Sequence, residues 1–330
     1  GSRAEATNFC LYHALFPDLG IESYKSGMAA SYGIFSSKVQ AQQRQMRQRM
    51  DVVSMSISLF VPWILFCIVF ADMTFFLHYA YPFVAWFIAG GAGLFVTVLG
   101  ASSVFSVLRR GERTRNPTWL IFLFVTCFLA VGLGLVLGNV NYWTYTQSYY
   151  DLKHMNIYSD VNPSMTYGQQ VMDAGQISFT DDVELDLKLA MGFKNKDTYC
   201  VAPITVSSSS GPTPLASYDF WVVGINCCDH HTASFRCGPY DSTSAHSGLR
   251  VIHDEMRPFF RLAVQEAEAV HSLKAIHPLF LFWSEDTTAD LLLFLDEGYK
   301  WYYIGVLVHF GFQLFCVALA ANAFAVMSHS

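Results

Sequence analysis

The stretch FVAWFIAGGAGLFVTVLGASSVFSVL, from Phe83 to Leu108, contains no charged residue. A helix needs about 20 predominantly apolar residues to cross the roughly 30 Å hydrocarbon core of a bilayer. Because a helix on the surface of a soluble domain carries polar residues on one face, a helix that is apolar on every face indicates a membrane span. Three further stretches share this character: Val52–Ala71, Trp119–Val140 and Trp301–Met327. The sequence therefore predicts four transmembrane helices.

The composition of the whole chain agrees with this prediction. Hydrophobic residues make up 53% of the sequence and charged residues 14%, whereas a soluble domain carries about 25% charged residues. The net charge of −6 argues against a nucleic-acid partner, since such proteins use a surplus of Lys and Arg to contact phosphates. We expect an integral multi-pass membrane protein surrounded by membrane lipids.

The distribution of charge predicts the orientation. Residues 1–51 and the connection between spans two and three together hold ten basic and five acidic residues, whereas residues 142–300 hold ten basic and twenty acidic. Because basic residues are retained on the cytosolic side, both termini should lie in the cytosol or stroma. We expect four regions: an N-terminal segment (1–51), transmembrane helices one to three (52–141), a lumenal or extracellular domain (142–300), and helix four with the C-terminus (301–330).

The lumenal domain reads as α+β. Its first part is rich in β-branched and aromatic residues, which predict strands in 176–179, 183–189, 199–206 and 218–228, with a surface loop over 207–214. From Gly248 the pattern becomes helical, with Pro258 in a first turn and His277-Pro278 at the end. A last helix, Thr287 to Glu297, should lead into span four.

Four cysteines fall in this domain: Cys200, Cys227, Cys228 and Cys237. An even number on the side predicted to be oxidising indicates two disulfides. Adjacent cysteines seldom pair with each other. This leaves Cys200–Cys227 with Cys228–Cys237, or Cys200–Cys228 with Cys227–Cys237. A zinc site is the alternative, because Asp229, His230 and His231 follow directly, but paired zinc ligands are usually spaced by two to four residues. We expect disulfides and no metal.

Small residues recur every four positions in two of the spans. One set lies in span two and the other in span three: Ala89, Gly93, Thr97 and Ala101; Ala130, Gly134 and Gly138. Such stripes let helix backbones approach closely. We expect spans two and three to pack within the chain, and contact with another protein is the alternative.

Few residues suggest a chemical site. His309 and Gln313 lie one turn apart in span four, where they can bond to a neighbouring helix; alternatively His309 or His78 ligates a pigment. The absence of charged residues deep in the spans argues against transport. His253, Asp254 and Glu255 resemble a general-base cluster, but no HExxH, GxSxG or glycine-rich phosphate loop accompanies them. We expect no catalytic residue.

The topology resembles that of tetraspanins, with four spans, cytosolic termini, a short first outer loop and a large cysteine-bearing second one. Two features differ: Asp229 follows the cysteine pair where tetraspanins have glycine, and no cysteine lies between Cys237 and Cys316. The stretches YDFWVVGINCC, RCG, GLRVIHDEMRPFFRLAVQEAEA and HPLFLFW more closely resemble a family of multi-pass membrane proteins of dinoflagellate algae, over residues 165–327. This resemblance implies no assigned activity and suggests a plastid thylakoid or other organelle membrane.

The function expected from these observations is that of a non-enzymatic subunit or scaffold of a larger membrane protein complex, presenting its lumenal domain to partners. Two alternatives remain open. The first is a pigment-associated accessory subunit of a photosynthetic supercomplex, holding chlorophyll or carotenoid. The second is a lumenal enzyme centred on His253, Asp254 and Glu255.

Overall fold

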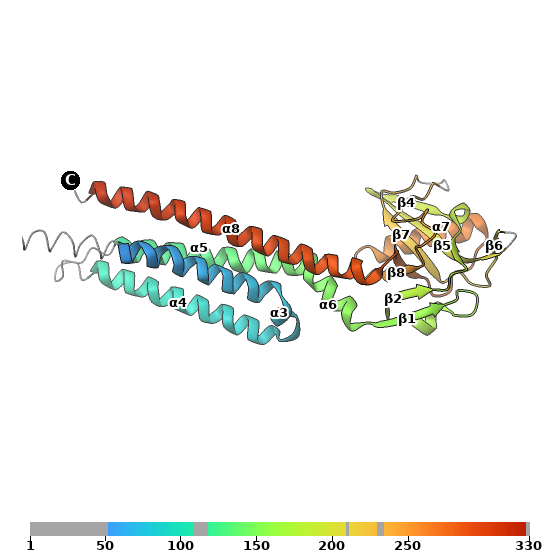
Figure 1. The fold of residues 1–330 in the computed structure, drawn as a ribbon, viewed down its shortest axis with the longest axis horizontal. Helices are drawn as coiled ribbons and strands as arrows, with labels where there is room; N and C mark the ends of the chain where they lie inside the picture. Colours follow the sequence, from blue (N-terminus) through green and yellow to red (C-terminus); the bar gives the residue numbers. More distant parts are fainter. Residues whose placement is uncertain (1–51, 109–117, 209–210, 230–233, 328–330) are drawn as a thin grey trace, which may run out of the picture. The chain divides into compact units, whose positions relative to one another are not determined.

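The structure is a computed structural model of the chain, and it describes residues 52–108, 118–208, 211–229 and 234–327 (Figure 1). The N-terminal segment, most of the Arg-rich connection, and His230 and His231 lie outside these residues. Pro62–Gln313 forms one compact unit. The contacts described below all lie within that unit.

Within the part of the chain that the structure describes, four helices are long and apolar enough to cross a membrane, as predicted. They are the first apolar helix (Val52–Thr74), α4 (Pro82–Leu108), α5 (Thr118–Asn141) and α8 (Thr287–Met327). The short helix α3 (Phe76–Ala80) connects the first apolar helix to α4. Pro82 opens α4, where its missing N–H costs nothing and its fixed φ suits a helix.

Two of these helices extend beyond the predicted spans. α5 runs on through a π-helical turn, Tyr142–Thr146, into α6 (Gln147–His154). α8 begins at Thr287, because the Asp286 carboxylate accepts hydrogen bonds from the backbone N–H groups of Thr288 and Ala289 at 2.9 and 3.2 Å. The predicted lumenal helix therefore continues into span four as one helix, so the domain is entered and left through helices.

A nine-stranded sheet lies between α6 and α8 in the chain. The strands are β1 (Asn156–Val161), β2 (Ala174–Phe179), β3 (Val183–Leu185), β4 (Met191–Asn195), β5 (Asp197–Ser208), β6 (Gly211–Thr213), β7 (Phe220–Ile225), β8 (Ser247–Arg250) and β9 (Leu279–Ser284). Their order is β1-β2-β8-β9-β7-β5-β3, and β4 and β6 also pair with β5. The pairs β1–β2 and β7–β9 are parallel, and the others are antiparallel.

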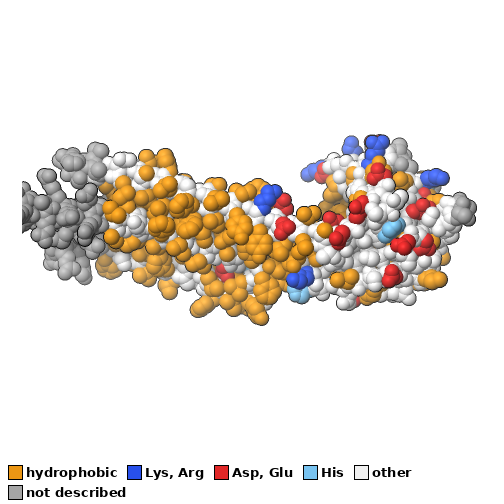
Figure 2. Space-filling view, viewed as in Figure 1, with side chains coloured by type: hydrophobic (Ala, Val, Ile, Leu, Met, Phe, Trp, Pro, Cys, Tyr) orange, Lys and Arg blue, Asp and Glu red, His pale blue; other side chains and the backbone are white. Residues whose placement is uncertain are grey.

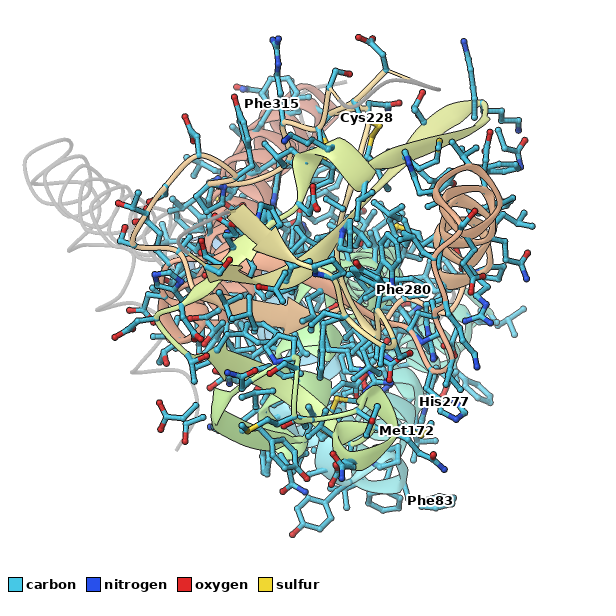
Figure 3. All side chains as sticks on the ribbon, turned by 90° about the vertical axis from the view of Figure 1, so that its right-hand side faces the viewer. Phe83, Met172, Cys228, His277, Phe280 and Phe315 are labelled. Atoms are coloured by element: carbon cyan, nitrogen blue, oxygen red, sulfur yellow. A yellow bond between two sulfur atoms is a disulfide. The ribbon has the colours of Figure 1, made fainter. Side chains whose placement is uncertain are left out.

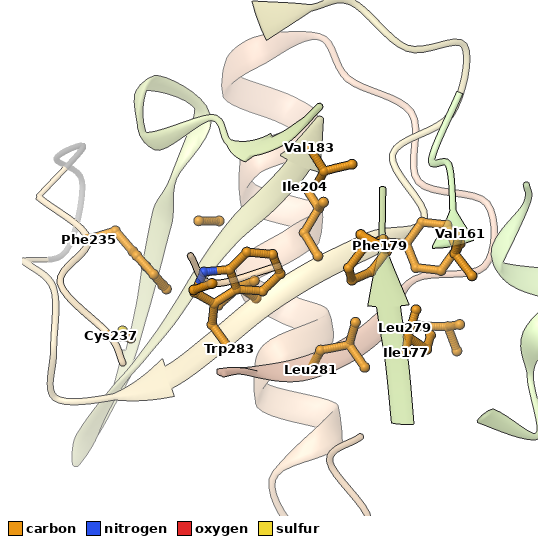
Figure 4. Close-up of a cluster of buried hydrophobic side chains, with 14 of the residues drawn as sticks. Val161, Ile177, Phe179, Val183, Ile204, Phe235, Cys237, Leu279, Leu281 and Trp283 are labelled. Carbon is orange, nitrogen blue, oxygen red and sulfur yellow. The ribbon is translucent and has the colours of Figure 1, made fainter. Parts of the chain in front are cut away.

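The interior strand β7, which lies between β9 and β5, is buried on both faces. Trp221 and Val223 pack under α7 (Arg257–His271), whereas Phe220 and Val222 face the opposite core. This follows from the alternation of side chains along a strand. Figure 4 shows the opposite core, where Ile177 comes from β2, Ile204 from β5, and Leu281 and Trp283 both from β9. The sheet therefore has a hydrophobic layer on each side, and α7 covers one of them.

The helical prediction from Gly248 onward was wrong at both of its ends. Ser247–Arg250 forms strand β8, α7 begins only at Arg257, and it ends at His271 rather than at His277-Pro278. Ser272 stops the helix by adopting a left-handed backbone with φ 54°. Residues 207–214 were predicted as a loop, but Ser207 and Ser208 end β5 and Gly211–Thr213 pairs back onto it. The prediction of a disulfide-bonded α+β domain between helices three and four is confirmed.

Candidate functional site

The four long helices expose apolar side chains over most of their surface. Figure 2 shows hydrophobic side chains covering these helices, while charged side chains gather over the sheet domain. Phe83 and Phe87 on α4 are 91% and 82% exposed, and Leu307 on α8 is 71% exposed. Contiguous apolar surface of this kind in a folded chain marks contact with a membrane or with another protein.

A cluster of aromatic residues lies on α8 next to the charged pair Glu297 and Lys300, whose side chains are 2.8 Å apart. Trp301 and Tyr303 are exposed, while Tyr299 stacks on Phe75 with ring centroids 4.5 Å apart. Aromatic rings beside charged residues are typical of the boundary between hydrocarbon and water. This cluster marks one end of the apolar part of α8.

The stripe of small residues predicted on α5 is buried and lies against the first apolar helix; it consists of Ala130, Gly134 and Gly138. A Cβ at Gly134 would come within 3.2 Å of Val69, and a Cβ at Gly138 within 2.6 Å of the Met73 Cβ and 3.1 Å of the Phe70 carbonyl oxygen. The two backbones therefore approach closely here. The α5 stripe contacts the first helix at these glycines, whereas we had expected it to pack against span two.

Spans two and three, which are α4 and α5, pack against each other as predicted, but their contact includes residues outside the two stripes. A Cβ at Gly100 would lie 2.7 Å from the Phe124 ring, and the Ser103 hydroxyl donates to the Leu120 carbonyl oxygen at 3.3 Å. Within the predicted α4 stripe Ala89 is buried and Gly93 is half-buried, but Thr97 and Ala101 are exposed. Half of that stripe is therefore left on the outer surface of the described helices.

His309 and Gln313 of α8 both point into the protein interior. The His309 ring stacks on Phe66 of the first apolar helix, with centroids 4.1 Å apart and planes inclined by 19°. Its Nε2 is buried and meets no hydrogen-bond partner among the described residues. Gln313 is 1% exposed. Next to this pair, the Trp63 indole N–H donates to the Val306 carbonyl oxygen at 3.2 Å.

His78 lies on α3, where its Nδ1 is 2.8 Å from the Met73 carbonyl oxygen and serves as the donor. Its ring lies against Tyr142, with centroids 4.3 Å apart. Asp72, which follows the predicted first span, is 7% exposed, and neither of its carboxylate oxygens has a hydrogen-bond partner within the described residues. Its position at the end of an apolar stretch was visible in the sequence, but its burial depends on tertiary packing.

Two polar side chains connect the long helices through hydrogen bonds, and neither contact was predicted from the sequence. Asn141 donates from its amide to the Gly298 carbonyl oxygen at 2.9 Å, which links α5 to α8. The Thr146 hydroxyl donates to the Thr74 carbonyl oxygen at 2.6 Å, which links the π-helical turn to the first apolar helix. Such bonds between helices fix their register where packing alone is non-directional.

The four domain cysteines form two disulfides, Cys200–Cys228 and Cys227–Cys237, which is one of the two pairings left open by the sequence. The first ties β5 to the end of the β7 segment, and the second closes the adjacent loop. The sulfur atoms of Cys200, Cys227 and Cys237 all lie within 4.8 Å of one another. The structure therefore groups the two disulfides in one cluster, which we call the cystine cluster.

The residues proposed for a lumenal enzyme lie on the surface. His253, Asp254 and Glu255 are all exposed, just before α7. The Asp254 carboxylate pairs with Arg257 at 2.9 Å instead of with the imidazole. These exposed residues therefore belong to the solvent-facing segment that leads into α7.

At the β1–β2 edge, Asp173 accepts hydrogen bonds from the Asn156 amide and the Tyr158 hydroxyl. The first of these bonds contributes most to holding the pKa of Asp173 below its usual range. The bond to Asp173 also raises the pKa of Tyr158, since it stabilises the protonated phenol. These residues fix the edge strand β1 to the segment before β2.

Comparison with protein families, curated proteins and solved structures finds no match for this chain. Three features of the molecule bear on its function. They are an apolar helix surface, a set of buried contacts between helices, and a sheet domain that contains the cystine cluster.

Proposed function

We propose that the chain is an integral multi-pass membrane protein that serves as a non-enzymatic subunit or scaffold of a larger membrane complex. The observation that carries the proposal is the apolar surface of the four long helices, exemplified by the exposed Phe83, Phe87 and Leu307. Exposing such surface to water costs about 25 cal/mol for each Å². Lipid or a partner helix removes that cost.

The proposed orientation places residues 142–300 in an oxidising lumen or outside the cell, and the termini in the cytosol or stroma. Two independent features support it. One is the basic surplus of residues 1–51 and the Arg-rich connection. The other is the pair of disulfides, which persist in oxidising compartments. A thylakoid membrane is the location suggested by the sequence resemblance.

The scaffold role is favoured over the enzyme role by the geometry of the candidate residues. The exposed His253 cluster presents no convergent set of acid and base groups, since Asp254 is paired with Arg257. By contrast, Thr97 and Ala101 leave small side chains on the outer surface of α4. A partner helix approaches closely at residues of this size.

The pigment-associated alternative receives no such support. The His309 ring is covered on one face by Phe66, and its Nε2 is enclosed by atoms of the chain itself. A chlorophyll would have to displace these atoms before its magnesium could be ligated. An absorption spectrum of the purified protein tests this alternative directly, because bound chlorophyll or carotenoid gives visible bands.

The experiment for the subunit role is purification from native membranes in a mild detergent, followed by native-mass measurement. We expect a complex far larger than one chain with its detergent, containing other integral membrane proteins. The double variant Thr97→Leu/Ala101→Leu should reduce this assembly. Its matched control is Ser102→Leu/Ser106→Leu, which adds a comparable volume at exposed positions on another face of the same helix. A monodisperse single chain without partners would refute the subunit role.

A further inference from the structure

The two disulfides of the cystine cluster are close enough to react with each other. The sulfur atoms of Cys200, Cys227 and Cys237 lie within 4.8 Å of one another, and Cys228 is bonded to Cys200. Because Cys227 and Cys228 are consecutive residues, each contributes to a different disulfide at the same point of the chain. Thiol–disulfide exchange requires only that a thiolate reach a neighbouring disulfide sulfur.

The strand register and one glycine create this proximity. Cys200 on β5 lies directly opposite Gly224 on β7. A Cβ at Gly224 would come within 2.5 Å of the Cys227 sulfur and 2.7 Å of the Cys237 sulfur. Since glycine has no side chain, the second disulfide can lie against β7 beside Cys200. Any larger residue would push the two disulfides apart.

The cluster has a buried side and a partly accessible side. Cys200 and Cys237 are 0% and 4% exposed and belong to the hydrophobic core. Cys227 and Cys228 are only half-buried, and the exposed Asp229 follows them. Cys228 lies towards the periphery of the domain in Figure 3. A thiol from solution therefore meets the Cys228 sulfur before the Cys200 sulfur to which it is bonded.

Opening that bond from outside leaves the Cys200 thiolate in an apolar environment. A thiolate buried in apolar surroundings is unfavourable. The Cys227–Cys237 disulfide lies next to it and offers an immediate acceptor. Capture by this second disulfide moves the charge onto another sulfur without exposing Cys200 to solvent.

We propose that the cystine cluster is a thiol–disulfide exchange site that takes a low-molecular-weight thiol at Cys228. The thiolate attacks the Cys228 sulfur, forming a mixed disulfide and releasing the Cys200 thiolate. The Cys200 thiolate attacks the Cys227 sulfur, forming Cys200–Cys227 and releasing the Cys237 thiolate. The Cys237 thiolate then attacks Cys228 in the mixed disulfide, forming Cys228–Cys237 and returning the small thiol. Nothing is oxidised or reduced overall, and the domain exchanges one pairing for the other.

The test uses the full chain in mild detergent with reduced glutathione as the probe. Samples are quenched with N-ethylmaleimide and analysed unreduced by mass spectrometry, with fragmentation between Cys227 and Cys228 to separate the pairings. We expect glutathione on Cys228 in the early samples and the pairing Cys200–Cys227 with Cys228–Cys237 in the later ones. Direct conversion of the original pairing to free thiols, without the second pairing, would overturn the proposal, as would a first adduct on another cysteine.

The variant Cys228→Ser traps the middle step. It leaves a Cys200 thiol beside the Cys227–Cys237 disulfide, so part of the protein should contain Cys200 bonded to Cys227, with Cys237 as the free thiol. In the control Cys67→Ser, which removes a free cysteine of the first apolar helix, the original pairing should persist. Finding Cys200 only as a free thiol in folded Cys228→Ser would contradict the exchange. If that variant does not fold, the glutathione experiment on the unsubstituted chain decides.

Discussion

Gly138 and Gly93 occupy different kinds of helix surface. Gly138 of α5 lies against the first apolar helix, where a Cβ would come within 2.6 Å of the Met73 Cβ. Around Gly93 of α4 no atom lies within 4 Å of such a Cβ among the described residues. Substitution by alanine should therefore lower the free energy of unfolding at Gly138 but not at Gly93.

We expect Gly138→Ala to lower the free energy of unfolding by about 1–3 kcal/mol, because overpacking forces two backbones apart. Gly93→Ala should leave it unchanged or raise it by up to about 1 kcal/mol through helix propensity. Both can be measured by unfolding the chain in detergent micelles. Equal effects at the two glycines would contradict the packing of α5 on the first helix.

Asp173 provides a prediction about pH. Hydrogen bonds from Asn156 and Tyr158 lower the pKa of its carboxyl group in the folded state. The stabilisation is therefore present above the unfolded pKa of about 3.9, and it is lost as pH falls through the folded value. Asp173→Asn should lower the thermal midpoint at pH 6 more than at pH 3.

The control for this pH dependence is Asp241→Asn, at an exposed position of the same domain. Near-ultraviolet circular dichroism of the buried Trp221 and Trp283 reports on the domain core. If Asp173→Asn and Asp241→Asn shift the midpoint equally at both pH values, the hydrogen bonds at the β1–β2 edge do not stabilise the fold.

At the scale of elements, the two disulfides close loops of different length. Their sequence separations are 28 residues for Cys200–Cys228 and 10 residues for Cys227–Cys237. Loop closure in the unfolded chain predicts a stabilisation of roughly 3–4 kcal/mol for the longer loop and about 3 kcal/mol for the shorter. The double variants Cys200→Ala/Cys228→Ala and Cys227→Ala/Cys237→Ala should therefore both destabilise the domain.

Denaturant titration of these two variants measures the loss, and reduction of the unsubstituted chain gives the combined effect. Removing the disulfide that closes the longer loop should lower the free energy of unfolding more than removing the other disulfide. A reduced chain that unfolds at the same denaturant concentration as the oxidised one would show that neither disulfide stabilises the domain.

Elements differ in how far the sequence could predict them. The apolar parts of the four long helices were predicted from the sequence, because a continuous apolar stretch can be recognised without knowing what it packs against. Strands β8 and β9 were missed: β8 has only four residues, and both become strands by pairing with each other and with elements distant in sequence. The extension of α5 through the π-helical turn was also missed, because the apolar stretch ends where the polar Asn141 and the aromatic Tyr142 follow in the sequence.

The sequence also predicted only part of the candidate site. The cysteines that form disulfides were identified by their number and compartment, but the pairing depends on the register of β5 and β7. The burial of Ala130, Gly134 and Gly138 follows from their spacing, whereas the helix they contact does not. Spacing assigns residues to a face, and only tertiary structure assigns that face a partner.

At the scale of the whole molecule, the proposed topology places the sheet domain and the C-terminus on opposite sides of a membrane. Lys196 is an exposed turn residue between β4 and β5, with φ 62°, and is a suitable point for an inserted epitope. A second epitope is placed after Ser330. Digestion by protease in sealed vesicles with the cytosolic face outward then compares the two sides.

The most direct test of the central claim is this protease protection. We predict that the epitope after Ser330 is digested in intact vesicles, while the epitope after Lys196 is protected until detergent opens the membrane. Digestion of both epitopes in intact vesicles, or the reverse pattern, would contradict a four-span protein with its disulfide-bonded domain on the oxidising side.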